Sequence, residues 1–526
     1  MNQPITTEIT GSKPASGEAS LVRELGTIDA TMIVMGSMIG SGIFITSAES
    51  ARLVGAPGWL LAAWALAGVM TVSGAICAAE VAAMMPRAGG QYVFLREAYS
   101  PMFGFLFGWA MFLVVQTGTI AAVAVAFAKF LGVFFPSVSA KAYLVSPIRL
   151  GGFAVSLSTE QLVAIALIGF LTAVNMRGLK LGKWIQNTFT FTKTAALFGL
   201  IVVGLFLGSN VASAAWTSSW WDPSANGWDS RTAFPDLPMQ GMPALLLLLG
   251  LAMIGPLFSQ SAWNNVTFTG GEVRDPARTL PRALILGTSS VVLLYFLANV
   301  AYVVTLPLDG IQHAANDRVG TATMRAILGD KGEAIMAAAI LVSTFGCVNG
   351  LVLAGARVYY AVARDGLFFQ SVATTNRRHV PAAALVAQGI WAALLALPVT
   401  VITDPVTGKV VDYGKIYNEL LEFVIPVDVT FYTLMVGTVI ALRLKAPHLS
   451  RPYRTIGYPF PVVIYIGLAI LLVLDFIYLK PWTSGKGFLI VLAGIPVYLI
   501  WSRGARARMS ALETSAPKPE PLGGDF

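Results

Sequence analysis

Long apolar runs separated by short polar segments repeat along almost the whole chain. Each run has about 20 residues or more, the length that an α-helix needs to cross a bilayer, and the apolar positions do not alternate as they do in a β-barrel. The pattern predicts an all-α polytopic membrane protein with about twelve transmembrane helices. They lie near residues 27–51, 58–84, 101–135, 159–176, 184–208, 243–270, 282–306, 331–363, 381–402, 416–443, 458–480 and 486–502.

Small and polar residues interrupt the middle of the first run. Three glycines and two serines lie between Gly36 and Gly42. Because unwound backbone survives in a membrane only when it is buried in protein or lines a cavity, we interpret the interruption as two half-helices joined at a functional site. The second half-helix would begin near Ser41, with free N–H groups suited to a small anion such as a carboxylate. A close helix-packing face is the alternative interpretation.

The sixth run carries a matching interruption. Gly255-Pro256 is followed by polar residues from Ser259 to Asn265. Proline removes a backbone donor, and interrupted spans at corresponding places in two halves of a chain are typical of transporters built from inverted repeats. An ordinary proline kink without a ligand is the competing explanation.

Composition agrees with a membrane protein. The 526 residues are 56% hydrophobic and 12% charged, and the mean hydropathy is +0.71. The net charge of +8 does not indicate nucleic-acid binding, because the basic residues lie in short loops. Most of them fall on the side of the N-terminus, which predicts that both termini are cytoplasmic. Both cysteines lie in apolar runs, and no spacing suggests a metal or cofactor site.

Several short motifs occur in a characteristic order. They are Gly40-Ser41-Gly42-Ile43-Phe44, Pro86-Arg87-Ala88-Gly89-Gly90, Phe258 to Asn264, Glu272 with Asp275-Pro276, Arg364-Asp365-Gly366 and Arg451-Pro452-Tyr453. Together they resemble the L-type amino acid transporter branch of the amino acid–polyamine–organocation superfamily. The chain departs from that pattern at Ser261, Ala262 and Gly271, which leaves the substrate side chain open.

The resemblance implies the fold of the sodium-coupled leucine transporter, with five helices, an inverted five, broken helices one and six, and two extra helices. We therefore expect a tail at residues 1–22, a transporter core at 23–443 with repeats near 27–208 and 243–443, two more helices at 444–509 and a second tail at 510–526. The tails are polar and rich in Ser, Pro, Gly, Glu and Thr, so they are predicted to be disordered.

The same resemblance suggests how an amino acid would bind between spans one and six. Its carboxylate would meet N–H groups around Ser41 and Gly42. Its ammonium would meet carbonyls near Met38, Ile39, Phe258 and Ser261. The predicted substrate residues are Met38, Ile39, Gly40, Ser41, Gly42, Phe258, Ser259, Ser261 and Gln116. Phe258 is the predicted lid, whereas a bond between helices remains the alternative role of Gln116.

Lys193 lies about nine residues into the fifth span, hence about 14 Å deep. A lysine at that depth is costly unless it faces the bundle interior and has a partner. In related sodium-independent carriers, a lysine amine occupies the second sodium site. The resemblance therefore predicts that Lys193 links the first helix near Gly36–Ile39 to the eighth near Ser343 and Thr344. An error in the span boundary is the other explanation.

The predicted function is sodium-independent transport of neutral L-amino acids across the inner membrane by alternating access, through exchange or proton coupling. Asp428 and Glu422 keep a cationic amino acid or polyamine carrier as the alternative. A membrane-embedded enzyme is disfavoured because the three histidines are scattered in loops. The expected partners are the amino acid and the lipid bilayer, with no cofactor, no metal, no nucleic acid and no obligate ancillary subunit.

Overall fold

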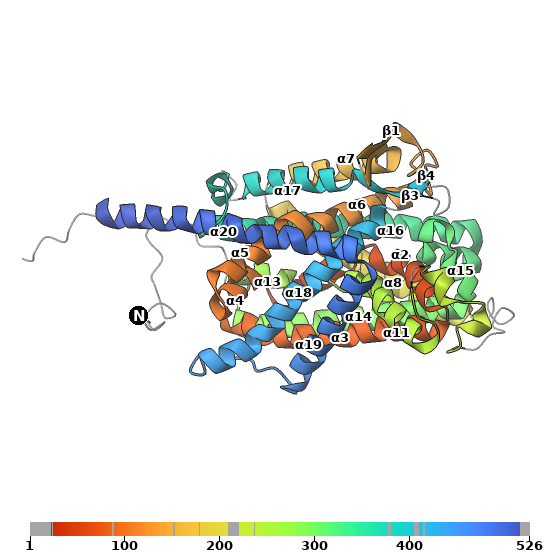
Figure 1. Ribbon diagram of the computed structural model, residues 1–526, viewed down its shortest axis with the longest axis horizontal. Coiled ribbons are helices and arrows are strands. Elements are labelled where there is room, and N and C mark those ends of the chain that lie inside the picture. The colour runs from red at the N-terminus through yellow and green to blue at the C-terminus, as the bar shows by residue number, and fades with distance from the viewer. Residues whose placement is uncertain are drawn as a thin grey trace, which may run out of the picture.

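The structure is a computed structural model. It describes residues 23–515 except 24, 87–88, 151–152, 178, 209–219, 236, 377–379, 404–409 and 414–415. The predicted tail at 1–22, Arg87 and the last residues of the C-terminal tail lie outside the described residues. Helices dominate and run mostly along the long axis of the molecule (Figure 1).

The long helices follow the predicted spans. They are α1 Thr27–Met38, α2 Gly42–Val54, α3 Pro57–Met84, α5 Pro101–Ala110, η1 Met111–Val115, α6 Gln116–Leu131, α7 Thr159–Asn175, α8 Leu179–Leu207, α11 Gly241–Ala252, α12 Ile254–Ser259, α14 Pro276–Thr305, α16 Val319–Arg364, α17 Ala382–Leu395, α18 Ile416–Lys445, α19 Phe460–Leu479 and α20 Pro481–Ser515. Among the described residues, nine helices or joined helices are long and apolar enough to cross a membrane, and the bent pair α1–α2 adds a tenth. The shorter apolar helices α7 and α17 fall in two further predicted spans.

Shorter helices connect these elements. They are α4 Gln91–Ala98, η2 Ser224–Asn226, α10 Ser230–Ala233, α13 Asn265–Phe268, η3 Gly270–Glu272, α15 Leu308–Gln312, η4 Ala315–Asp317 and η5 Gln370–Ala373. Local sequence fixes several helix ends. Gly55 ends α2 with a φ of 63°, Pro57 occupies the first turn of α3, and the Ser158 side chain caps the N-terminus of α7.

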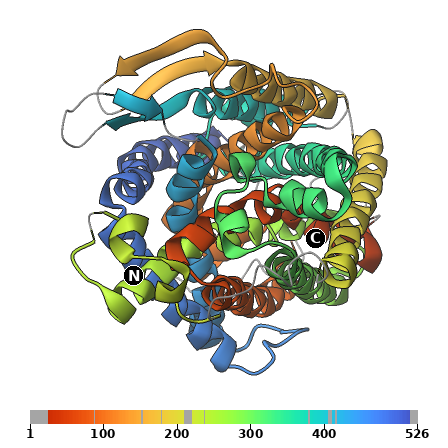
Figure 2. The ribbon, with the colours of Figure 1, turned by 90° about the vertical axis from the view of Figure 1, so that its right-hand side faces the viewer.

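The predicted helical fold also carries a small four-stranded antiparallel sheet that the sequence did not predict. Its strands, in spatial order, are β1 Tyr143–Leu150, β2 Phe153–Ser158, β3 Pro398–Thr403 and β4 Val410–Tyr413. The sheet joins the segment before α7 to the segment after α17, at one end of the bundle (Figures 1 and 2). Val399, Val401 and Ile402 are β-branched, so the apolar pattern of 381–402 covers a helix that ends at Leu395 and the strand after it.

The C-terminal helix also extends beyond its predicted end. α20 continues to Ser515, into the segment predicted as a tail from residue 510. Arg, Ala, Met and Leu are frequent between residues 503 and 512 and are good helix formers, which accounts for the extension. The helix projects from the bundle at the end opposite the sheet (Figure 1).

The two interrupted spans lie at the centre of the packing. α2 packs against α11 and α12, whereas α1 packs against α13. The first half of one span therefore meets the second half of the other, so the two chain segments run in opposite directions. α14 packs against α3, α1 and α8, and α16 packs against α8 and α6. We call the end that carries the strands the sheet end, and the end that carries Leu25 the N-terminal end.

Candidate functional site

The first span unwinds where the glycine pattern predicts. α1 ends at Met38, α2 begins at Gly42, and their axes differ by 43°. In the described part of the chain, the N–H groups of Gly40 and Ser41 donate to no backbone carbonyl. Since Gly42 opens α2, its N–H also lacks a preceding helical turn. The Gly40 N–H faces the Tyr295 hydroxyl, so the donors at the helix start that suit a carboxylate are those of Ser41 and Gly42.

Side chains from three other helices hold the carbonyls of this break. Lys193 Nζ of α8 donates to Gly36 O, and Tyr295 Oη of α14 donates to Met38 O at 2.9 Å. Ser343 Oγ of α16 lies 3.4 Å from Ile39 O and 3.5 Å from Gly40 O. These contacts provide hydrogen-bond donors to backbone carbonyls that have no partner within a helix, and they fix the shape of the break.

The predicted lysine site is present in part. Lys193 is 1% exposed and reaches the first helix, and Ser343 reaches the same break from the eighth. Thr344 does not join them, because its hydroxyl donates to Ile340 O and Leu341 O of its own helix. Cys347, which the sequence did not single out for the site, lies here too, with its Sγ 3.7 Å from Ser37 O.

The sixth span breaks inside the polar run that the sequence marks, between Ser259 and Asn265. Pro256 stays inside α12, which continues to Ser259, and Ala262 then takes a φ of 63°. Ser261 Oγ donates to Phe258 O at 2.8 Å. The Ala262 N–H donates to Tyr432 Oη at 3.1 Å. This break is therefore held by α18, a contact that the sequence did not predict.

The two breaks touch each other directly. A Cβ added at Gly42 would overlap Ser259 Oγ and lie 2.9 Å from Ser259 Cβ. Thr46 Oγ1 is 3.0 Å from Gly42 O and 3.4 Å from Ser259 Oγ. Only glycine fits at position 42 in this arrangement, because any side chain would push α2 away from α12.

Tyr417 of α18 is the main residue that sequence reasoning missed. Its hydroxyl lies 3.2 Å from Ser41 Oγ, and its ring packs edge-on against Phe258, with 6.0 Å between ring centroids. Phe258 is buried beside the break, as a lid residue requires. A tyrosine near the start of a long apolar run was the available signal, but periodicity alone does not say which helix it faces.

Gln116 lies apart from this group. Its Nε2 donates to Leu351 O of α16 at 2.7 Å, which is the bond between helices that the alternative interpretation names. The structure describes no contact of Gln116 with Ser41, Gly42 or Phe258. The residues that it brings together are thus Met38 to Gly42, Phe258 to Ser261, Lys193 and Ser343, with Tyr417 added.

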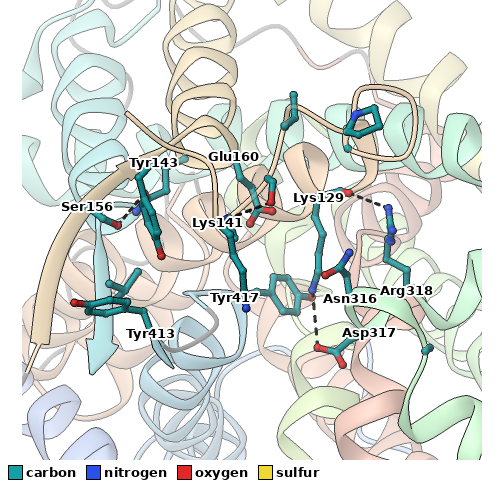
Figure 3. Close-up of a pocket in the computed structure, with 18 of the residues that line it drawn as sticks. Lys129, Lys141, Tyr143, Ser156, Glu160, Asn316, Asp317, Arg318, Tyr413 and Tyr417 are labelled. Carbon is teal, nitrogen blue, oxygen red and sulfur yellow. Dashed lines mark hydrogen bonds and ion pairs between the residues drawn. The ribbon is translucent and has the colours of Figure 1, made fainter. Parts of the chain in front are cut away.

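A cavity of about 640 Å³ opens at the sheet end, with Lys129, Glu160 and Arg318 in its wall (Figure 3). Tyr417 lines this cavity and also contacts Ser41. Lys129 lies beside the Tyr417 ring, 5.9 Å from its centroid, and 4.0 Å from Asp317 Oδ2. The Tyr417 side chain therefore stands between the cavity and the first break.

The N-terminal end is closed by contacts between segments far apart in the chain. Leu25 forms a parallel bridge with Val273, and Arg357 pairs with Glu272 at 3.0 Å. Glu80 accepts hydrogen bonds from Arg443 and from Thr455, each as short as 2.7 Å.

The short helix α4 is tied to the same end. Tyr92 and Arg96 both contact the carboxylate of Asp365. Burial and that carboxylate raise the pKa of the Tyr92 hydroxyl, which keeps it protonated as a donor. Among the residues that the structure describes, these contacts thus seal the N-terminal end, whereas the sheet end is hollow.

Comparison with known proteins gives one consistent result. The family model described as amino acid permease matches residues 25–500. The large neutral amino acids transporter small subunit 2 of Rattus norvegicus is 29% identical over 92% of this chain and 81% of its own. The b(0,+)-type amino acid transporter 1 of Homo sapiens is 28% identical over 92% and 88%. The serine/threonine exchanger SteT of Bacillus subtilis (strain 168) is 27% identical over 91% and 96%.

These matches span nearly the whole bundle, both interrupted helices included. The family and these relatives are transporters, which decides against the membrane-embedded enzyme considered above. The predicted resemblance to L-type transporters is confirmed. The chain belongs to the amino acid permease family of the amino acid–polyamine–organocation superfamily and is a multi-pass membrane protein.

Proposed function

We propose that this permease carries neutral L-amino acids between the two half-helix breaks by alternating access, without sodium. The main supporting observation is the first break, where Ser41 and Gly42 present N–H groups without backbone acceptors among the described residues. A substrate carboxylate would bind these donors, and its ammonium would lie near carbonyls of the second break. The relatives named for large neutral amino acids and for serine and threonine support the neutral class.

Competition in proteoliposomes tests this recognition. Unlabelled amino acids, their methyl esters and polyamines would compete against radiolabelled L-alanine and L-leucine. Esters should compete far more weakly than free acids, because the ester loses its charge and one acceptor oxygen. Esters that compete as strongly as the acids would remove the carboxylate from the proposed mode of binding.

Sodium independence rests on the Lys193 ammonium. It is buried and donates to a carbonyl of the first helix, as a bound cation would be coordinated. Uptake into liposomes should therefore be the same in choline and in sodium buffers. An absolute requirement for sodium would overturn this part of the proposal. Exchange and proton-coupled uptake are then separated by preloading the liposomes with amino acid or by imposing a pH gradient.

A second candidate, transport of cationic amino acids or polyamines, is favoured by Asp428. This carboxylate is 6% exposed, and it makes no hydrogen bond or ion pair with the residues that the structure describes. It lies three helical turns from Tyr417 and about one from Tyr432, on the face of α18 that meets both breaks. A cationic side chain would satisfy it.

Asp428→Asn separates the two candidates. If the substrates are cationic, the variant should lose competition by L-arginine and L-lysine while keeping competition by L-alanine. If the substrates are neutral, the ranking of competitors stays the same. Asp475→Asn is the matched control, because Asp475 is a buried aspartate on α19, outside the breaks.

We also propose that the sheet end faces the outside of the cytoplasmic membrane, with both termini in the cytoplasm. The loops at the N-terminal end carry the larger share of Lys and Arg, which supports this orientation. The chain would act without an ancillary subunit, because the described residues include only two cysteines, both buried, and neither can anchor a partner by a disulfide. Transport by the purified single chain tests whether an ancillary subunit is needed. Cysteines placed at each end and labelled from one side of the membrane test the orientation.

A further inference from the structure

The cavity at the sheet end contains more charge than a simple entrance needs. Arg52, Lys129 and Arg318 contribute cations to its wall, and Glu160 and Asp317 contribute carboxylates. Some of these groups neutralise each other. Arg52 pairs with Asp317 at 2.9 Å, and Lys129 lies 4.0 Å from the same carboxylate. Asp317 therefore already has partners in the wall.

Arg318 lies in the same wall but contacts backbone carbonyls instead of the Asp317 carboxylate. Its guanidinium donates to two backbone carbonyls through long bonds, 3.3 Å to Ala315 O and 3.4 Å to Lys129 O. It forms no ion pair with any carboxylate in the part of the chain that the structure describes. Burial lowers the pKa of Arg318 below its usual value, opposed by the more distant charges of Glu333 and Glu160. The cation is thus partly desolvated and only weakly compensated.

Glu160 provides the opposite charge across the same cavity. It stands in the first turn of α7, where the helix N-terminus favours a carboxylate. Within the described ranges, it makes no side-chain hydrogen bond and no ion pair. Glu160 and Arg318 affect each other electrostatically but do not form a pair (Figure 3). The wall therefore holds a cation and an anion kept apart, both open to a ligand.

We propose that Arg318 and Glu160 form an outer binding site for the zwitterionic backbone of an amino acid. The guanidinium binds the α-carboxylate and the Glu160 carboxylate binds the α-ammonium, before the substrate passes Tyr417 to the first break. This inference rests on the proposed function, since it takes the sheet end as the outside and an amino acid as the substrate. A free zwitterion satisfies both wall charges at once, whereas a simple anion satisfies only Arg318.

Sided kinetics distinguish this site from the central one. The external KM for radiolabelled L-alanine is measured in intact cells, and the internal KM in inside-out vesicles from the same cells, each after subtraction of an empty-vector control. Arg318→Gln and Glu160→Gln should each raise the external KM about threefold to tenfold, the range expected of a charge-assisted bond near solvent. The internal KM and the maximum rate should stay at their wild-type values, because the central site is unchanged.

Arg325→Gln is the matched control. Arg325 lies in α16, the helix that begins directly after Arg318, but its side chain is 60% exposed and pairs with Asp330 and Glu333. It should leave both KM values unchanged. Arg318→Lys keeps a point charge without the forked donor geometry and should give an intermediate external KM. It replaces Arg318→Gln if that variant does not reach the membrane.

Three outcomes would overturn the inference. One is an external KM that neither substitution changes. Another is an equal rise of KM on both sides, which indicates damage to the central site or the fold. The third is a rise with Arg318→Gln but not with Glu160→Gln, which would leave a simple anion site. If the wild-type chain transports no amino acid at all, the proposed function itself fails, and this result is distinct from the other three.

Discussion

At the scale of single residues, Lys193 shows what depth in a span can predict. Its position in the sequence indicated a buried ammonium that reaches the first helix, and its contact with Gly36 confirms that partner. The Thr344 hydroxyl donates to the carbonyl one turn before it, as a threonine inside a helix readily does, and its predicted role beside Lys193 stays a prediction. Sequence position gives the depth of a side chain, but not which of two neighbouring hydroxyls turns toward the first break.

Lys193→Ala should therefore reduce L-alanine transport at least tenfold, because it removes the donor that holds Gly36 O and leaves that carbonyl unsatisfied in the core. Uptake into sodium-free proteoliposomes measures the effect. Lys331→Ala is the control, since Lys331 is exposed on α16. Full activity of Lys193→Ala would show that the ammonium has no part in the transport cycle.

At the scale of helices, the breaks were predictable and their contacts were not. The glycines of the first span located its break, which the structure places at residues 39–41 between α1 and α2. Glycine weakens a helix whatever packs around it, so the sequence was sufficient here. The polar run after Pro256 located the second break, which lies between the end of α12 at Ser259 and the start of α13 at Asn265. The sheet was missed because β1 and β3 lie far apart in sequence, at positions 143–150 and 398–403.

The contact between α2 and α12 can be tested by substitution of Gly42. Gly42→Val should lower transport at least tenfold with normal membrane yield, because the new side chain would collide with Ser259. Gly199→Val is the matched control in α8, where an added Cβ meets nothing within 4 Å. In addition, Ser259→Gly should partly rescue the milder Gly42→Ala. Independent effects of these two substitutions would contradict the direct contact.

The buried carboxylate of Glu80 leads to a prediction about stability. It joins α3 to α18 and to Thr455, and it is 1% exposed. Glu80→Gln should lower the free energy of unfolding by roughly 1–3 kcal/mol, as expected for hydrogen bonds to a buried charge. The melting temperature in detergent measures this loss. Glu97→Gln should have little effect, because Glu97 is 37% exposed; equal melting temperatures of the two variants would rule out a structural role of Glu80.

At the scale of the molecule, one end is sealed and the other is hollow, an asymmetry that the sequence did not predict. Hydropathy predicts the spans, and the basic loops predict an orientation. Neither pattern depends on which end of the carrier is open. The seal consists of contacts such as Leu25 with Val273 and Glu80 with Arg443, between segments far apart in the chain. The alternating access that we propose would open these contacts while the cavity at the sheet end closes.

Cys347 reports on that motion. It is buried beside the first break, where a Cβ added at Gly40 would lie 3.0 Å from its sulfur. In a Cys77→Ala background, a membrane-permeant maleimide should modify Cys347 slowly at rest and several-fold faster during exchange of L-alanine. Mass spectrometry of the intact protein gives the rate. A rate that substrate does not change would indicate that the break stays packed against α16 throughout transport.

The Lys193 ammonium has a consequence for the energetics of the whole carrier. A sodium ion that binds at such a place can dissociate into the cytoplasm, and each departure releases part of the energy stored in an ion gradient. Under the proposed function, an amine covalently attached to α8 never departs, so it holds the first helix in shape and can release a proton but no sodium ion. A carrier that depends on this group alone can equalise or swap pools of amino acids. To accumulate them, it needs a gradient of some other solute.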